Sequence, residues 1–286
     1  MSRLGDHLEL VRAPAALTVL GDALVGALSA GRAPHPGRIA ALALSSTCLY
    51  AAGMAANDYA DAELDARERP ERPIPSGRIT RTRALGTALG LTGAGVGAAF
   101  VAGRSAGLVS LALAAALWSY DLVFKSTAAG PFAMAACRGL DVLMGGAGRG
   151  WRGAAVPAAA VAVHTLGVTA VSRGEVAGTT PGVARGAVAA SVAAAAAGLL
   201  PPGQAAAAVA GGAHYLAGVL PAQTALVDAP TASAARAATR DGIRGVVRLQ
   251  AAFAARAGAP LAAAALLGID VLGRSLGRRA KKGDIT

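Results

Sequence analysis

A short stretch near residue 60 holds the side chains best suited to chemistry. It reads N-D-Y-A-D-A-E-L-D from Asn57 to Asp65 and follows an apolar stretch that is almost uncharged, residues 39–56. On a helix, Asn57, Asp61 and Asp65 are four residues apart and share one face. Gathered carboxylates repel one another unless a cation lies among them. Oxygen donors without a nearby His or Cys favour Mg²⁺ over zinc.

This pattern predicts a Mg²⁺ site with Asn57, Asp61 and Asp65 as ligands. Asp58 is a further candidate ligand, although it lies about 100° away from that face. A bound Mg²⁺ at the end of a membrane helix would indicate a phosphorylated substrate. The alternative is a solvated, acidic helix end at a membrane surface.

The composition of the chain predicts an integral membrane protein. Of its 286 residues, 54% are hydrophobic and 15% are charged, and the mean hydropathy is +0.50. Soluble domains carry about 25% charged residues. Runs of Ala, Gly, Val and Leu reach the length of about 20 residues that crosses a bilayer. We therefore expect an all-α, polytopic fold with about nine transmembrane helices in one bundle.

The expected organisation is a single domain, 1–286, with a basic C-terminal tail, 273–286. Two long charged loops, 58–80 and 228–244, interrupt the apolar runs, and a shorter loop lies at 172–182. The expected helices are 13–30, 38–57, 82–103, 105–124, 130–148, 153–171, 183–200, 203–227 and 245–272.

The formal net charge of +11 comes from Lys and Arg between the apolar runs and in the tail. These residues are not interleaved with aromatic residues, so they indicate topology signals and phosphate contacts, with no nucleic acid as partner. With a cytoplasmic N-terminus, most of them fall on the cytoplasmic side together with the long loops. This predicts a site on the cytoplasmic face of the cell membrane. Nine helices would place the tail outside, which indicates either a miscounted helix or a tolerated exception.

The loop after Asp65 carries a resemblance to a known family. It continues A-R-E-R-P-E-R-P-I-P-S-G-R-I up to Ile79. The N-D-x-x-D-x-x-x-D run followed by R-P-I-P-S-G resembles the first signature of the UbiA family of intramembrane prenyltransferases. The three prolines end the helix, because they lack an amide donor and fix φ. Arg69 and Arg72 suit phosphate oxygens, or else they neutralise the neighbouring acids.

The resemblance implies an enzyme that transfers a prenyl group from a polyprenyl diphosphate to a small acceptor, such as an aromatic ring or a hydroxyl, within the membrane. Catalysis would depend on Mg²⁺ held by Asp61 and Asp65. It also implies that Lys125 contacts the diphosphate, with Tyr120 and Asp121 meeting the acceptor or orienting Lys125. The alternative for Lys125 is a lysine at a helix end that reaches the membrane surface.

Arg138 and Asp141 lie deep in an apolar run, 131–147. Their spacing of three residues predicts an ion pair on one helix face. Charged residues inside membrane helices are costly and usually functional, so we expect contact with phosphate or acceptor. A purely structural pair is the alternative. His164 and His214 stand alone in apolar runs, and we expect both to be hydrogen-bonded core residues.

The chain departs from the family at the second signature, D-x-x-x-D. The corresponding stretch reads V-S-R-G-E-V-A-G-T from Val171 to Thr179, so Glu175 is its only acid. Glu175 would hold Mg²⁺ with the help of water and phosphate oxygens, or Arg173 would supply a positive charge to the phosphate instead. This departure keeps open a second function, a non-catalytic isoprenoid- or lipid-binding or transport protein of the same fold.

Overall fold

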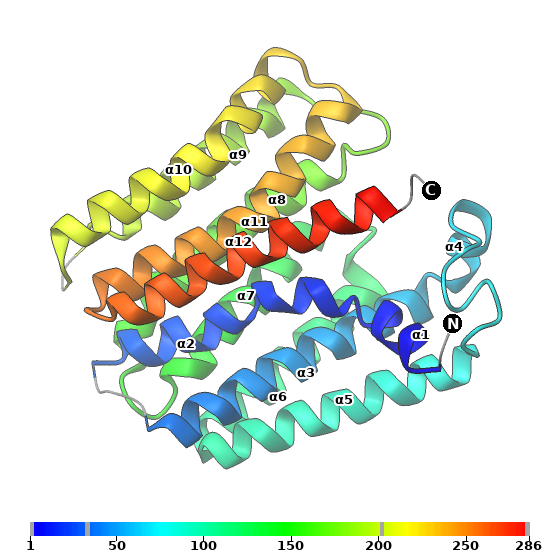
Figure 1. Cartoon of the computed structure of the whole chain (residues 1–286), viewed down its shortest axis with the longest axis horizontal. Coiled ribbons are helices and arrows are strands. Elements are labelled where there is room, and N and C mark those ends of the chain that lie inside the picture. The colour runs from blue at the N-terminus through cyan, green and yellow to red at the C-terminus, as the bar shows by residue number, and fades with distance from the viewer. Residues whose placement is uncertain (1–2, 32–34, 201–202, 284–286) are drawn as a thin grey trace.

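The computed structural model describes residues 3–31, 35–200 and 203–283. Helices are the only regular elements in these ranges, which confirms the all-α prediction (Figure 1). The elements are α1 (Arg3–Leu10), the 3₁₀ helix η1 (Ala13–Thr18), α2 (Leu20–Ser29), α3 (Pro36–Ala60), α4 (Ala62–Glu68), α5 (Arg81–Ala102), α6 (Arg104–Ser119), the π-helical turn η2 (Tyr120–Phe124), α7 (Gly130–Gly146), α8 (Trp151–Ser172), α9 (Pro181–Ala197), α10 (Ala205–Asp228), α11 (Ala232–Arg256) and α12 (Pro260–Gly283).

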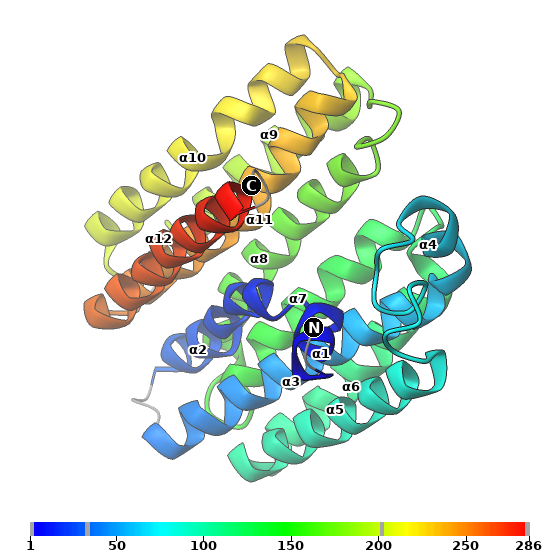
Figure 2. The same ribbon diagram turned by 45° about the vertical axis from the view of Figure 1, so that its right-hand side comes forward.

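The long helices form two packed halves, which Figure 2 shows side by side. In one half, α3 packs on α5, α5 on α6, and α6 on α7, while α2 lies against α3 and α7. In the other half, α8 to α12 pack in chain order, and α11 also contacts α8. The halves are joined by the contacts of α7 with α8 and of α2 with α8 and α11.

Glycines allow the closest of these approaches. A Cβ atom on Gly26 of α2 would collide with the carbonyl group of Val142 on α7, and one on Gly145 of α7 would collide with that of Ala23 on α2. Backbones this close are typical of membrane helices, where small residues replace the hydrophobic driving force of water.

Five helices among the described residues are long and apolar enough to cross a membrane: Pro36–Ala60, Arg81–Ala102, Arg104–Phe124, Trp151–Ser172 and Ala205–Asp228. Shorter apolar helices lie at Leu20–Ser29, Pro181–Ala197 and Pro260–Val271. These spans support the prediction of an integral membrane protein.

The C-terminal part of the chain corrects two sequence predictions. The segment 228–244, expected to be a loop, is helical from Ala232 onward. The single helix expected at 245–272 is wrong, because the chain turns after Arg256, where Gly258 has a φ of +78° and Pro260 opens α12. Glycine tolerates this backbone conformation, and proline is favoured in the first turn of a helix.

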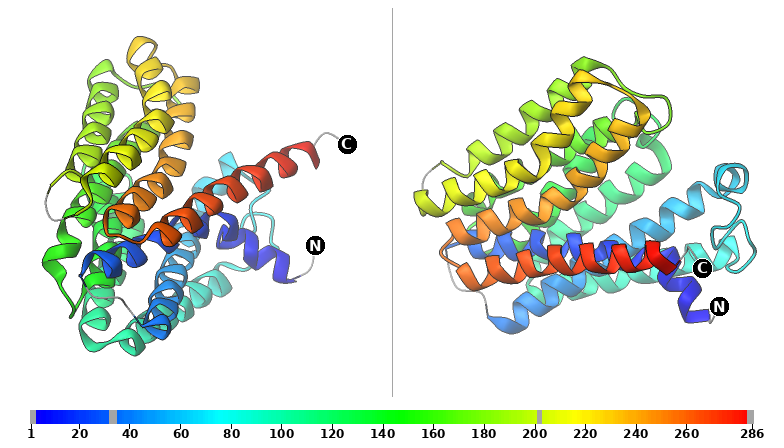
Figure 3. Two further views of the ribbon diagram at one scale, coloured as in Figure 1. Left: turned by 60° about the vertical axis from the view of Figure 1, so that its left-hand side comes forward. Right: turned by 45° about the horizontal axis from the view of Figure 1, so that its top comes forward.

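The extra helix changes the topology. Ten of the described helices have ten or more residues, since α1 and α4 are shorter. Helix α1 and the end of α12 lie on the same side of the bundle as α4 (Figure 1), and Figure 3 shows the first and last helices from two further directions. An even number of these helices would place α1 and the end of α12 on the same side of a membrane.

Candidate functional site

The acidic stretch spans the junction of α3 and α4, and Asn57, Asp61 and Asp65 stay on one helical face across it. Helix α3 ends at Ala60, and Asp61 caps it. The amide of Asp61 donates to the carbonyl of Asn57 (2.9 Å), and the amide of Asp65 donates to the carbonyl of Asp61 (2.8 Å). Bonds of this i to i+4 type keep the three side chains one turn apart, as the spacing predicts.

Basic side chains from outside α3 and α4 neutralise the aspartates. Lys125 Nζ lies 2.6 Å from Asp61 Oδ1. Arg72 Nη1 lies 2.6 Å from Asp65 Oδ2 and 3.3 Å from Asp58 Oδ1. The side chains of Asp58 and Asp65 are about 95% buried, and isolated carboxylates there would be costly. The fold therefore joins the acids of α3 and α4 to bases that the sequence separates.

Asp58 receives a second cation from the N-terminal segment. Arg12 Nη2 lies 3.0 Å from Asp58 Oδ1. The backbone of Arg12 has a φ of 48°, the only positive φ of a non-glycine residue among those described. Such a conformation costs about 1–3 kcal/mol and needs surrounding contacts to hold it.

Those contacts come from α1. Arg78 Nη1 lies 2.6 Å from Glu9 Oε2 and 2.8 Å from Asp6 Oδ1, and these hydrogen bonds, first to Glu9 and then to Asp6, raise the pKa of Arg78. Leu10 is fully buried against Ile79 and its neighbours. We call Arg12, Asp58, Asp61, Asp65, Arg72 and Lys125 the acid–base cluster.

A π-helical turn places the residues around Lys125. The amide of Lys125 donates to the carbonyl of Tyr120 (2.9 Å), a bond that encloses one residue more than an α-helical turn. Single π-helical turns are rare and frequent at functional sites. Asp121 is buried in this turn, and its Oδ1 accepts a hydrogen bond from Asn57 Nδ2 (3.2 Å). Tyr120, Asp121 and Lys125, which the family resemblance assigned to the substrate site, thus lie in or directly after one π-helical turn beside Asn57.

Arg138 is partly buried in the bundle but does not form the predicted pair with Asp141. Arg138 Nε lies 2.9 Å from Asp22 Oδ2 of α2, and Asp141 Oδ1 accepts a hydrogen bond from Ser46 (2.5 Å). The prediction failed because it considered one helix face, whereas α2 packs directly against α7. Asp22 is fully buried and also accepts a hydrogen bond from Gln250 Nε2 (2.6 Å). This second network links α2, α7 and α11.

In the loop between α8 and α9, Arg173 and Glu175 have different neighbours. A guanidinium nitrogen of Arg173 donates to the carbonyl of Thr127, which ties this loop to the one after Lys125. The carbonyl of Glu175 accepts from Arg236 (2.5 Å). Among the described residues, no contact joins the Glu175 carboxylate to Asp61 or Asp65.

Two further predicted residues lie outside the network as well. Arg69 caps the end of α4 and is exposed, and no side-chain contact ties it to the cluster within the described ranges. His164 is a hydrogen-bonded core residue as predicted, since its ring contacts the carbonyl of Gly242 (3.0 Å) and the hydroxyl of Tyr215 (2.7 Å). His214 is exposed, so the core prediction for it was wrong.

Comparison with known proteins identifies the family. A sequence model described as the UbiA prenyltransferase family matches residues 19–226. The chain belongs to the UbiA prenyltransferase family. This match includes α3, α4, the π-helical turn and the loop with Glu175, and so covers every part of the cluster except Arg12.

Curated relatives match a smaller part of the chain. It is 39% identical over 122 residues to a digeranylgeranylglyceryl phosphate synthase of Methanopyrus kandleri, a segment that covers 42% of this chain and 44% of that relative. It is 33% identical over 127 residues to a digeranylgeranylglyceryl phosphate synthase of Korarchaeum cryptofilum, a segment that covers 44% of this chain and 45% of that relative. The chain thus matches less than half the length of these relatives.

Solved structures share the fold over nearly the whole chain. A structure of digeranylgeranylglyceryl phosphate synthase superposes with a TM-score of 0.70 at 20% identity, covering 90% of this chain and 99% of that one. A UbiA homologue from Archaeoglobus fulgidus bound to DMAPP and Mg²⁺ has a TM-score of 0.61 at 14% identity, with coverages of 85% and 98%. At these identities the likeness concerns the fold alone.

The donors of the cluster fit Mg²⁺ with a ligand that brings phosphate oxygens. Within the described part of the chain, no three carboxylate, His or Cys side chains converge on one point, so a metal cage made only of protein is not formed. Mg²⁺ is commonly held by one or two carboxylates together with substrate phosphates and water. Asp61 and Asp65, one turn apart and free of His or Cys neighbours, provide such a pair.

Sequence reasoning missed Arg12, Asp22 and Gln250. Asp22 stands in an apolar run and could have been recognised, because an acid in a membrane helix calls for a partner. No local pattern marks Arg12, whose contact with Asp58 spans 46 positions of the chain.

Proposed function

We propose that this protein transfers a prenyl group from a polyprenyl diphosphate to a small acceptor within the membrane, with Mg²⁺ as cofactor. The observation that carries the proposal is the acid–base cluster at the α3–α4 junction. It places three aspartates and three cations within ion-pair distance at the end of a membrane-spanning helix. A diphosphate with Mg²⁺ presents both charges that such a cluster can bind.

The proposed binding step is an exchange of partners. Asp61 and Asp65 would hold Mg²⁺, with Asn57 beside them and Asp58 remaining with Arg12. Lys125 and Arg72, released from these aspartates, would then contact phosphate oxygens, for which the guanidinium fork is well suited. Bound Mg²⁺ neutralises the charge that develops on the leaving diphosphate.

The residues around the cluster would support the rest of the reaction. Cleavage of the C1–O bond leaves an allylic cation, and the apolar helices keep water away from it. Tyr120 and Asp121 sit in the π-helical turn next to Lys125, where they would meet the acceptor. Arg138 and Asp141 lie deeper in the bundle, and we assign them to the acceptor end rather than to the diphosphate.

The acceptor is the open part of the proposal. The relatives are named as synthases of digeranylgeranylglyceryl phosphate, a glyceryl phosphate with prenyl groups. By that similarity we propose a hydroxyl of a phosphorylated small molecule as the first acceptor to test, and an aromatic ring as the second.

The decisive experiment incubates purified protein with labelled geranylgeranyl diphosphate, Mg²⁺ and each class of acceptor, and identifies products by mass spectrometry. A prenylated acceptor together with released diphosphate supports the proposal. Glu63→Gln is the matched control for Asp61→Asn, because Glu63 belongs to the same acidic stretch while its side chain is 88% exposed. The control should keep wild-type turnover.

The separation of Glu175 from the aspartates favours a second candidate function. In this candidate function, the aspartates of the first signature would bind an isoprenoid diphosphate. Without acids of the second signature beside them, the protein would bind or move this ligand and not cleave it. Tight, Mg²⁺-dependent binding of geranylgeranyl diphosphate without diphosphate release, for every acceptor tested, would select this candidate.

We also propose that the cluster faces the cytoplasm at the cell membrane. The basic loops around 58–80 and the end of α12 lie on one side of the bundle, and Lys and Arg are enriched on the cytoplasmic side of membrane proteins. Labelling of single cysteines placed at Ser76 and at Ser105 with a membrane-impermeant reagent tests this. In intact cells, only the cysteine at 105 should react.

A further inference from the structure

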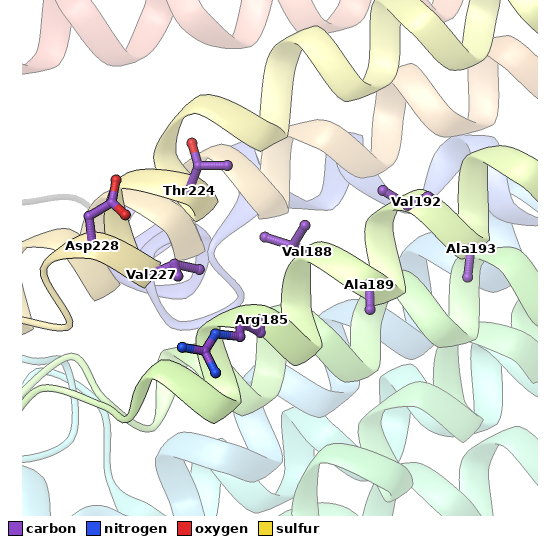
Figure 4. A pocket seen from close by; sticks show the side chains of 8 residues that line it. All are labelled: Arg185, Val188, Ala189, Val192, Ala193, Thr224, Val227 and Asp228. Atoms are coloured by element: carbon purple, nitrogen blue, oxygen red, sulfur yellow. The ribbon is translucent and has the colours of Figure 1, made fainter.

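Helices α9 and α10 form a groove on the outside of the bundle (Figure 4), away from the end of α3 and α4 that carries the acid–base cluster (Figure 1). Its volume is about 620 Å³, and five of its eight lining residues are Val or Ala. On their other sides these helices contact α8 and α11, and α10 is among the helices able to span a membrane. The groove therefore opens towards lipid.

The floor and the walls of the groove come mainly from α9. Val188 and Val192 stand one turn apart, and the small side chains of Ala189 and Ala193 lie beside them. From Arg185 to Ala193 the helix rises by about 12 Å, at 1.5 Å per residue. This length and the apolar lining suit part of one aliphatic chain.

Two opposite charges mark one end of the groove. Arg185 lies near the start of α9, and Asp228 is the last residue of α10. Figure 4 shows both side chains at this end, with Val188, Ala189, Val192 and Ala193 extending away from them along α9. Among the described residues, neither side chain forms a hydrogen bond or an ion pair with a protein group. The groove thus ends in a donor fork and a carboxylate that are both available to a ligand.

We propose that this groove binds a glycerophospholipid with a primary-amine headgroup, such as phosphatidylethanolamine. Arg185 binds the phosphate, since guanidinium matches phosphate oxygens. Asp228 accepts hydrogen bonds from the ammonium, which carries three donors. A choline headgroup has no N–H to donate, and an anionic headgroup brings no cation to Asp228. One acyl chain lies along Val188 and Val192.

The test is native mass spectrometry of the purified full chain with equal amounts of dioleoyl phosphatidylethanolamine, phosphatidylcholine and phosphatidylglycerol. We expect one retained lipid, with the ethanolamine form about tenfold preferred, which corresponds to about 1.4 kcal/mol. Asp228→Asn should remove the preference, and Arg185→Gln should reduce retention of all three lipids. Arg83→Gln is the matched control, because Arg83 is an exposed arginine near the start of α5, outside the groove.

Filling the groove tests the position of the acyl chain. Ala193→Phe and Ala189→Phe should each abolish retention of the lipid, whereas Ala206→Phe, at an exposed position near the other end of α10, should not. Equal retention of the three lipids by the wild-type protein would overturn the assignment of the headgroup. Unchanged retention in both groove-filling variants would overturn the site itself. Neither outcome depends on prenyl transfer, because the groove lies apart from the cluster.

Discussion

The pair of Asp61 and Lys125 allows the proposed exchange of partners to be tested by a double-mutant cycle. The two charged atoms lie 2.6 Å apart, and their side chains are 23% and 20% exposed. Breaking a fully buried ion pair costs about 3–5 kcal/mol, while exposed pairs contribute about 0–1 kcal/mol. For a pair that is about one-fifth exposed we expect a value between these limits, about 2 kcal/mol.

Asp61→Asn and Lys125→Met should each lower the free energy of unfolding by about 2 kcal/mol, because each leaves the other charge without its main partner. The double variant should lose about the same amount as either single variant, which gives a coupling energy of about 2 kcal/mol. Reversible unfolding in mixed micelles of a mild detergent and sodium dodecyl sulfate measures these values. Prenyl transfer should fall at least ~100-fold in all three variants, since each lacks a side chain that binds Mg²⁺ or phosphate.

Glu63 and Arg81 supply the control pair. Their closest charged atoms are 3.6 Å apart, and their side chains are 88% and 48% exposed. The same cycle on this pair should give a coupling energy of no more than about 0.5 kcal/mol and wild-type activity. Additive losses of stability for Asp61 and Lys125 would show that the two do not interact. Prenyl transfer by the double variant at the wild-type rate would refute their role in binding the diphosphate.

Three further outcomes follow from other contacts. Arg138→Leu should destabilise the protein more than the double variant Arg138→Leu/Asp22→Leu, because the single change leaves a fully buried carboxylate unpaired; equal unfolding free energies would refute the pairing. Arg78→Gln should release α1 and speed cleavage of the N-terminal segment by trypsin in detergent, and an unchanged cleavage rate would mean that other contacts hold α1. Gly145→Ala should lower the free energy of unfolding, because the added Cβ meets the backbone of α2. The control Gly86→Ala, where nothing lies within 4 Å of the added Cβ, should be neutral or stabilising by up to about 1 kcal/mol in the same unfolding assay.

The acidic stretch was predictable because its information is local. The spacing of Asn57, Asp61 and Asp65 survives the change from α3 to α4, since the i to i+4 hydrogen bonds continue through the junction. The partner Lys125 was found through the family resemblance and not through any pattern that links it to Asp61. Helical spacing can report which residues share a face, but not which base crosses from another helix.

Long-range contacts explain most of what the sequence did not reveal. Arg12 meets Asp58 only because α1 is fastened to the loop before α5 by Arg78. Arg138 was expected to pair with Asp141 but pairs with Asp22, because glycines let α2 and α7 approach closely. Such contacts depend on how helices pack, and no local pattern in the sequence encodes the pairing.

The last third of the chain was misjudged for a different reason. Arg236, Arg240 and Arg244 made residues 228–244 appear to be a loop, yet these three arginines share one exposed face of α11 while Ala235, Ala238 and Thr239 are buried. The turn at Gly258 was hidden by the apolar residues on both sides. At the second signature, α8 ends at Ser172 and Glu175 lies in the following turn, so Val171 and Glu175 do not share a helix face.

The most direct test of the central claim is binding of geranyl thiolodiphosphate, an analogue that is cleaved slowly, measured by calorimetry with and without Mg²⁺. We predict binding that requires Mg²⁺ in the wild-type protein and in Glu63→Gln, and that falls by at least about tenfold in Asp61→Asn, which corresponds to about 1.4 kcal/mol. Binding of equal strength in the absence of Mg²⁺, or unchanged in Asp61→Asn, would contradict the claim that the acid–base cluster holds a Mg²⁺–diphosphate.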